Sequence, residues 1–221
     1  MEDMLWKFPH IGENIFKKLS NSNLAKCKKV TRAWEYFINN ERFYKQKVKY
    51  EMIQKDIDEK GRTQLHKVAE AGNFLKCSHI IDHVEEKNPQ DNYRVTPLHL
   101  AAGNGHISIC KLILENIQDK NPLANKDVTP LHYAANAGQF DVFKLIFENA
   151  EDKNPSSIKY PISPLHLAAS KGHFDICKLV IDNLQDENLC LSGYSVLTPL
   201  LLATLYDHDI IVNYMKSKIK Y

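Results

Sequence analysis

TPLHLAAGNGH, at residues 96–106, has near copies along the chain. They are TQLHKVAEAGN from Thr63, TPLHYAANAGQ from Thr129, SPLHLAASKGH from Ser163 and a more divergent TPLLLATLYDH from Thr198. The leucines of these lines, at positions 65, 98, 131, 165 and 200, are separated by 33, 33, 34 and 35 residues. Self-similarity at a fixed period of a few tens of residues predicts a stack of structural repeats.

The quoted line predicts a short helix. Thr96 can cap a helix that begins at Pro97, because the first helical residue needs no N–H and proline presets φ. Leu98, Ala101 and Ala102 then recur at i, i+3 and i+4, which places small apolar side chains on one narrow face. We therefore expect this helix to lie close against its counterpart in the next repeat.

A second helix is predicted after Gly105, since glycine commonly ends helices in the left-handed conformation. Ile109, Leu112 and Ile113 form the apolar stripe of this second helix. DKNP follows it at residues 119–122 and recurs at 152–155, and the proline prevents helix continuation. Each unit is thus a helix, a turn, a second helix and an extended finger, and neighbouring units must stack to bury their apolar faces.

The period near 33 residues and the T-P-L-H-x-A line resemble the ankyrin repeat. The resemblance implies an all-α ankyrin-repeat solenoid of about five repeats. The repeats are predicted at residues 55–90, 91–123, 124–157 and 158–189, with a degenerate capping repeat at 190–221. Asp207 at the glycine position and the polar tail MKSKIKY are in keeping with a capping role for the last repeat.

The sequence departs from the ankyrin pattern at two glycine positions. The glycine usual at the finger tip, two residues before the repeat threonine, is kept only as Gly61. Its counterparts are Arg94, Asp127, Pro161 and Val196, which leaves the finger geometry open there. The glycine usual after the second helix is also replaced, by Val84, Ile117, Ala150 or Leu184. We therefore predict that Asn116, Asn149 or Asn183 supplies the left-handed residue instead.

Cysteine and histidine recur with the same period. Cys77, Cys110 and Cys177 each lie twelve residues after a repeat leucine, where Phe143 holds the same place, and a position that accepts Cys or Phe is a core site. The histidines at positions 66, 99, 132 and 166 would sit on stacked helices about 8–10 Å apart, too far for one zinc ion. No metal or cofactor is predicted. In ankyrin repeats this histidine usually links neighbouring loops by hydrogen bonds.

The sequence contains no catalytic motif of the GxSxG type and no GxxxxGK phosphate loop. Asp56, Asp58 and Gly61 begin like an EF-hand calcium loop, but Lys60 and Lys67 stand at ligand positions. Five cysteines without a CxxC pair are typical of a reducing compartment. We do not expect an enzyme.

Residues 1–54 do not share the repeat and are predicted to form a small helical domain with a linker helix. The order FP, IFKKL, NLAKC, VTRAW and FY resembles an F-box, with phenylalanine for the usual leucine at Phe8 and threonine for cysteine at Thr31. The resemblance implies binding to a Skp-type linker protein, and through it to a cullin. The matching residues are Phe8, Pro9, Ile15, Phe16, Leu19, Leu24, Val30 and Trp34. The alternative is that these side chains form only a helical cap on the repeats.

Charge is divided unevenly along the chain. Residues 1–55 carry 12 basic and 6 acidic side chains, although the net charge of the whole chain is only +2. This asymmetry predicts two parts with different partners. Lys26, Lys28, Lys29 and Arg32 also allow a nucleic-acid-binding hypothesis, which is the least favoured of the three because a basic face is more often simply solvated.

In an ankyrin stack the fingers and first helices line a concave face that binds the partner. The residues that the resemblance places there are Tyr93, Arg94, Asn104, Lys126, Asp127, Tyr133, Asn136, Lys159, Tyr160 and Lys171. Tyrosine and arginine make good anchors because they bury much area at modest entropic cost. The alternative for any one of these residues is simple solvation.

The sequence thus predicts the substrate-recognition adaptor of a cullin and Skp-type ubiquitin ligase, which holds a target protein on its ankyrin repeats. The alternative is an ankyrin-repeat scaffold with no ligase connection. Glu2 and Asp3 do not fit a secretory signal, and no apolar stretch is long enough to span a membrane. We expect a monomer outside its complex, in the cytoplasm or nucleus, or in the host cytoplasm if the source is an intracellular bacterium or virus.

Overall fold

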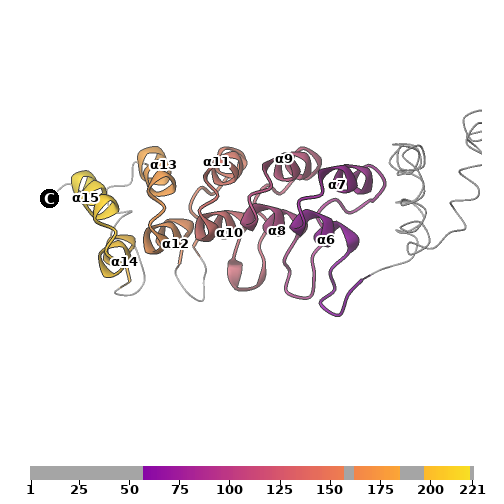
Figure 1. The fold of residues 1–221 in the computed structure, drawn as a ribbon, viewed down its shortest axis with the longest axis horizontal. Coiled ribbons are helices and arrows are strands. Elements are labelled where there is room, and N and C mark those ends of the chain that lie inside the picture. Colours follow the sequence, from indigo (N-terminus) through magenta and orange to yellow (C-terminus); the bar gives the residue numbers. More distant parts are fainter. Residues whose placement is uncertain (1–56, 157–161, 185–196, 220–221) are drawn as a thin grey trace, which may run out of the picture. The chain divides into compact units, whose positions relative to one another are not determined.

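A computed structural model describes residues 57–156, 162–184 and 197–219 (Figure 1). The chain divides into two units, Met1–Asp56 and Ile57–Tyr221, and all described residues belong to the second. The predicted F-box-like domain, with its linker-binding residues from Phe8 to Trp34, therefore lies outside the described residues. Lys159 and Tyr160 of the predicted target-binding face lie outside them too.

Ten α-helices in five pairs make up the described part of unit Ile57–Tyr221, with one 3-10 helix, η1 (Asn125–Asp127). The first helices of the pairs are α6 (Gln64–Glu70), α8 (Pro97–Gly103), α10 (Pro130–Ala137), α12 (Pro164–Lys171) and α14 (Pro199–Leu205). The second helices are α7 (Phe74–Ile81), α9 (Ile107–Asn116), α11 (Phe140–Asn149), α13 (Phe174–Leu184) and α15 (Asp209–Lys218). Figure 1 shows the first helices side by side in one row, the second helices in another, and the finger loops on the far side of the first row. The predicted all-α solenoid is confirmed.

The core is a continuous apolar layer that runs through the stacked pairs. Each inner first helix contacts the first helix of the repeat before it and of the repeat after it, as α8 contacts α6 and α10. The small side chains of Ala101 and Ala102 are fully buried, which allows this close approach. Cys110 and Phe143 occupy equivalent, fully buried positions, as predicted for a core site that accepts either residue. Truncating such an aromatic side chain typically costs about 3–5 kcal/mol.

Threonine or serine begins the inner first helices, and the repeat histidine completes the cap. At α8 the ring nitrogen Nδ1 of His99 accepts the backbone N–H of Thr96 (3.2 Å) and lies 2.9 Å from its hydroxyl oxygen. Pro97 follows as the first helical residue, as predicted. In the last repeat Leu201 replaces the histidine, and the Thr198 hydroxyl accepts the N–H of Leu201 instead (3.1 Å).

The predicted left-handed asparagine after the second helix is wrong. Asn116 and Asn149 remain helical, and each donates its side-chain N–H to the carbonyl oxygen four residues earlier (2.9 and 2.8 Å). The following residues, Ile117 and Ala150, are already extended. Asn183 makes the same side-chain bond (2.8 Å), and none of the three has positive φ. The side-chain amide closes the last turn, so no left-handed residue is needed.

A lysine and an asparagine of the DKNP segment join one repeat to the next. Lys120 donates from Nζ to the carbonyl oxygens of Leu114 and Ile117 at the end of α9 (both 2.5 Å). The neighbouring Asn121 accepts the backbone N–H of Leu131, in the first turn of α10, at Oδ1 (3.3 Å). The two adjacent side chains therefore satisfy the free carbonyls of one helix and a free N–H of the next.

The same arrangement recurs on both sides of this segment. Asn88 and Asn154 accept the N–H groups of Leu98 and Leu165 in the first turns of α8 and α12 (both 3.1 Å). Lys87 and Lys153 donate to the carbonyl oxygens of Ile81, in α7, and Phe147, in α11. We refer to each such pair as a Lys–Asn clamp.

The last repeat differs from the polar cap expected from its tail. Apart from Ile210, the exposed residues of α15 are polar, and Lys218 donates to Asp182 of α13 (2.7 Å). On α14, however, Leu201 and Leu205 are 38 % and 63 % exposed. Leu201 stands at the position of the repeat histidine, which is buried in the other repeats. The last repeat therefore exposes apolar side chains on its first helix, α14.

Candidate functional site

Buried histidines connect the first helix of one repeat to the finger of the next. Nδ1 of His99 accepts an N–H within its own repeat, so its other ring nitrogen, Nε2, is the protonated one and donates. The acceptor is the carbonyl oxygen of Val128 in the next repeat (3.1 Å). The equivalent pairs are His66 with Val95 and His132 with Ile162 (both 3.0 Å). This is the linking role that the ankyrin resemblance implied.

Burial keeps these imidazoles neutral. It lowers the pKa of His99 and of His132 to about 4, well below the usual value near 6.5, and the hydrogen bonds to the next finger offset only part of that shift. Burial also lowers the pKa of His66. At neutral pH each ring therefore remains in the uncharged form that can both accept and donate.

Backbone hydrogen bonds tie the fingers to one another. The N–H of Asn92 donates to the carbonyl of Lys60 in the preceding finger (2.9 Å), and the N–H of Asn125 donates to the carbonyl of Tyr93 (3.0 Å). Within the second finger, Asp91 accepts the N–H of Tyr93 at Oδ1 (2.8 Å). The first three fingers are thus connected to one another beside the first helices (Figure 1).

The finger tips keep left-handed geometry without glycine. Arg94 has φ 59° where Gly61 has φ 77°, and Asp127 has φ 58° at the equivalent position in the third finger. Lys126 beside it has φ 64°. In the second and third fingers the tip residue therefore keeps the left-handed conformation of Gly61, at a cost of roughly 1 kcal/mol for each left-handed side chain. Pro161 and Val196, at the two remaining tips, lie outside the described residues.

Tyr133 lies between the first helices and the fingers. Its ring makes an edge-to-face contact with His99 of the preceding repeat, with ring centroids 5.2 Å apart. A Cβ atom added to Gly103 would lie 3.2 Å from the Tyr133 ring, so the two repeats meet closely here. Burial raises the pKa of the Tyr133 hydroxyl, and the negative charge of Asp91 in the second finger raises it further. The hydroxyl is therefore neutral and sits near the finger.

Most predicted target-binding residues of the described chain are exposed. Tyr93 is 57 % exposed, and the other exposed members are Arg94, Asn104, Lys126, Asn136 and Lys171. Asp127 and Tyr133 are half-buried. Asn104 uses its side-chain N–H to close its own helix, with the Leu100 carbonyl as acceptor (2.9 Å). These residues come from three repeats and lie on the fingers and first helices.

Apolar residues of the same face were absent from the sequence-based prediction. The position of Tyr133 is occupied by leucine in the neighbouring repeats, at Leu100, Leu167 and Leu202, and all three are half-buried. The repeat register gives the signal that could have found them, because each stands four residues after the repeat threonine or serine. Sequence alone does not mark them as surface residues, because an apolar residue in a helix usually belongs to the core.

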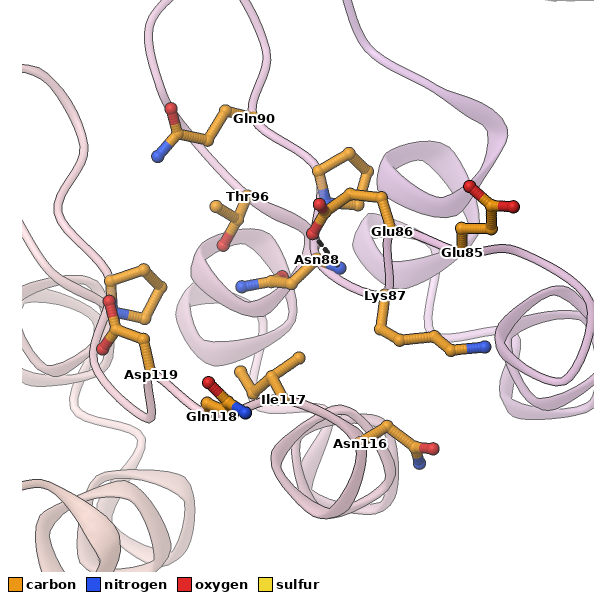
Figure 2. Close-up of a pocket in the computed structure, with 12 residues that line it drawn as sticks. Glu85, Glu86, Lys87, Asn88, Gln90, Thr96, Asn116, Ile117, Gln118 and Asp119 are labelled. Atoms are coloured by element: carbon orange, nitrogen blue, oxygen red, sulfur yellow. Dashed lines mark hydrogen bonds between the residues drawn. The ribbon is translucent and has the colours of Figure 1, made fainter.

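A separate polar groove lies between two successive connecting segments, residues 85–90 and 116–122 (Figure 2). Its volume is about 610 Å³. Figure 2 shows Lys87 pointing away from the groove, in keeping with its bond to α7, while Glu86 accepts the N–H of Asn88 (3.4 Å). The carboxylates of Glu85 and Asp119 also line the groove. None of the predicted target-binding residues lines it.

The cysteine thiols and the metal-binding side chains of the described residues bear on the chemistry that this part of the chain can support. Burial raises the pKa of the Cys77 and Cys110 thiols to about 12, which makes them poor nucleophiles. Residues 57–156, 162–184 and 197–219 bring together no group of three or more His, Cys, Asp or Glu side chains suited to a metal ion. Across the same ranges, every helix is too short or too polar to cross a bilayer.

Comparisons with known protein families agree with the repeat architecture. The family described as ankyrin repeats (3 copies) matches residues 35–124 and 65–157. The family described as ankyrin repeat matches residues 162–190. Among curated proteins, none matches this chain.

Proposed function

Because this chain belongs to the ankyrin-repeat family, we propose that it is the substrate-recognition adaptor of a cullin and Skp-type ubiquitin ligase. Ankyrin repeats imply binding to protein partners, and such proteins are typically binding scaffolds rather than enzymes. In the proposed arrangement the fingers and first helices hold a target protein, and residues 1–54 bind the Skp-type linker. The chain contributes proximity and no bond-making step.

The observation that supports target binding is the connected face formed by fingers and first helices. Tyr93 and Arg94 project from the second repeat and Lys171 from the fourth, and hydrogen bonds between neighbouring fingers and through the histidines hold the first three fingers in place. A preorganised face loses little conformational entropy when it binds. Exposed tyrosine and arginine side chains on such a face are suited to act as anchors.

The ligase part of the proposal rests on the sequence of residues 1–54. Eight residues from Phe8 to Trp34 follow the F-box order. The ankyrin match begins at residue 35, directly after Trp34, so these eight residues precede the matched repeats. That order would place a linker-binding module at one end of the chain and the target-binding repeats after it.

The second candidate function is an ankyrin-repeat scaffold without a ligase connection. The same match favours it, because its start at residue 35 reaches into the predicted F-box-like domain. Residues 35–54 would then belong to the repeats, which leaves fewer residues for an independent linker-binding domain.

Co-purification with a Skp-type linker protein separates the two candidates. The adaptor should form a complex at micromolar concentration, and the double variant Pro9→Ala with Leu24→Ala should abolish it because both residues belong to the F-box pattern. Lys26→Ala with Lys28→Ala changes the same segment outside that pattern and should leave the complex intact. A complex that never forms, or that the Pro9 and Leu24 changes do not affect, rejects the ligase role and leaves the scaffold.

A further inference from the structure

The concave face changes in character from the first repeat to the last. Four positions of each repeat can be compared: the residue before the repeat threonine or serine, and those four, seven and eight residues after it. In the first repeat they are Arg62, Lys67, Glu70 and Ala71, and in the last they are Leu197, Leu202, Leu205 and Tyr206. The face is thus charged at one end and wholly apolar at the other.

The apolar residues at the second end are accessible. Leu205 is 63 % exposed, Tyr206 55 % and Leu197 48 %, and Ile162 of the preceding repeat is 38 % exposed. Leu167 and Leu202 are half-buried beside them. These six residues, which we call the apolar end, come from two repeats whose first helices, α12 and α14, are in contact. Exposed apolar groups gathered in this way mark interaction sites more often than solvated surface.

Charge separates the two ends as well. In the first repeat Arg62 pairs with Asp58 (3.1 Å) and with Glu70 (2.9 Å), so the polar end satisfies its own charges. At the four compared positions of the last two repeats, Lys171 is the sole charged residue, and it is exposed. A partner that covers the apolar end therefore meets one cation in an apolar surrounding, which favours a carboxylate on that partner.

We propose that the apolar end is the anchor subsite of the concave face. It takes leucine or aromatic side chains from a segment of the target protein that carries an aspartate or glutamate next to them, and Lys171 pairs with that carboxylate. The inference rests on the proposed function in so far as the target binds on this face. Pairing of two copies through the same patch fits less well, because a two-fold contact brings Lys171 of both copies into one interface.

Selection from a phage-displayed random peptide library on the full-length chain tests the proposal. We expect selected peptides to combine leucine or aromatic residues with adjacent acidic residues. The affinity of a selected peptide, measured by fluorescence anisotropy, should fall about tenfold or more in Leu205→Ser with Tyr206→Ser. Lys171→Glu should weaken binding of the same peptide and reverse the effect of salt at this contact, because salt screens the new repulsion between the two carboxylates.

Matched control variants lie on the second helices. Leu75 and Ile210 are 69 % and 71 % exposed, so Leu75→Ser with Ile210→Ser removes as much exposed apolar surface away from the face. Lys178→Glu reverses an exposed charge on α13, the partner helix of α12. Both controls should bind the selected peptide as the unchanged chain does. Thermal unfolding checks that each variant is folded, and Lys171→Glu provides a test that leaves the apolar side chains in place.

Three results would overturn the proposal. The first is selected peptides that lack acidic residues, or no selected peptides at all. The second is acidic peptides whose binding depends on Tyr93 and Arg94 but not on the apolar end, which would retain the concave face and reject this subsite. The third is a dimer in analytical ultracentrifugation that Leu205→Ser with Tyr206→Ser dissociates. None of these affects the Skp-type linker experiment, so the two proposals fail separately.

Discussion

Four non-glycine residues of the described chain adopt left-handed backbone geometry, and each stands where the ankyrin pattern favours glycine or beside such a position. Asp207 is the simplest case, because it has φ 57° just after α14. The equivalent residue of each preceding repeat is a glycine with positive φ: Gly72, Gly105, Gly138 or Gly172. An L side chain in this conformation crowds the following carbonyl. The left-handed conformation of Asp207 therefore lowers the stability of the last repeat.

Replacing Asp207 by glycine should therefore stabilise the last repeat. We expect Asp207→Gly to raise the free energy of unfolding by roughly 0.5–1 kcal/mol, since the strain relieved exceeds the extra freedom of glycine in the unfolded chain. Urea denaturation followed by circular dichroism measures the change. The control is Asp209→Gly in the first turn of α15, which should destabilise. Equal effects of the two substitutions would contradict the explanation.

The buried histidines make stability depend on pH. The unfolded chain takes up protons on histidine below about pH 6.5, whereas the folded chain resists them until about pH 4 at His99 and His132. The unfolded state thus binds more protons in this window, and stability falls as pH decreases. Each of these two histidines should cost about 2 kcal/mol between pH 7 and pH 5.

Urea denaturation at a series of pH values between 7 and 5 measures this loss, before most carboxylates titrate. His99→Gln should be less stable at pH 7, because the link to the Val128 carbonyl is altered. It should also lose less stability on acidification, since one titrating group is gone. An unchanged slope in the variant would show that His99 is not among the groups responsible.

At the scale of the helices, the Lys–Asn clamps explain how consecutive elements join without the glycine usual in the family. Lys120 occupies the free carbonyls at the end of α9, and Asn121 holds an N–H at the start of α10. Because the two residues are adjacent, one short segment fixes the spacing between both helix ends. The proline that follows them prevents either helix from extending into the connection.

Asn121→Ala should destabilise the chain by about 1 kcal/mol, because the half-buried N–H of Leu131 loses its acceptor. Lys120→Ala should cost a similar amount through the carbonyls at the end of α9. Thermal unfolding measures both. Asn136→Ala is the matched control, since Asn136 is exposed within α10, and it should lie within about 0.5 kcal/mol of the unchanged chain. A similar loss in all three variants would count against the clamps.

At the scale of the whole repeat unit, stability should vary along the stack. The inner first helices, such as α10, contact a neighbouring first helix on both sides, whereas α14 contacts α12 alone among the described first helices. In a solenoid each repeat is stabilised mainly by its nearest neighbours. The last pair also lacks the histidine link, which leucine replaces at Leu201. It should therefore open more readily than the middle of the stack.

Hydrogen exchange detects this difference. Backbone amides of α14 and α15 should exchange at least about tenfold faster than those of α8 and α10, which corresponds to about 1.4 kcal/mol in opening free energy. A selected peptide bound at the apolar end should slow the exchange of α14 in particular. Uniform protection from α8 to α15 would instead mean that the unit opens as a single cooperative block.

The repeat line contains most of the information for the fold, because its period, capping threonine, proline and small apolar residues are all local signals. Leu98, Ala101 and Ala102 were correctly predicted to face the neighbouring helix, and Cys110 to be buried. The prediction for Asn116 was wrong, because a side chain that bonds to its own helix cannot be told by sequence from one that leaves it. The sequence also gave no sign that Lys120 and Asn121 act on different helices.

The candidate face was predicted only in part, because sequence does not show which apolar residues of a helix remain exposed. Exposed polar and aromatic residues such as Tyr93 and Arg94 stand out against a repeat pattern, and the structure places them on the fingers. Leu205 and Tyr206 did not stand out, because an apolar residue in a helical line is usually core. Their exposure follows from their place on the face: the equivalent residues Asn136 and Lys171 of the preceding repeats are exposed as well.

By itself the sequence determined the repeat, its all-helical units and the residues that each unit buries, because these follow from spacing along one stretch of chain. Only the tertiary structure decided which nitrogen of His99 donates to Val128, how Lys120 and Asn121 join two helices, and that Leu205 remains uncovered. The physical reason is that hydrogen-bond partners and solvent exposure depend on groups about one repeat away. Their distances are set when the helices pack.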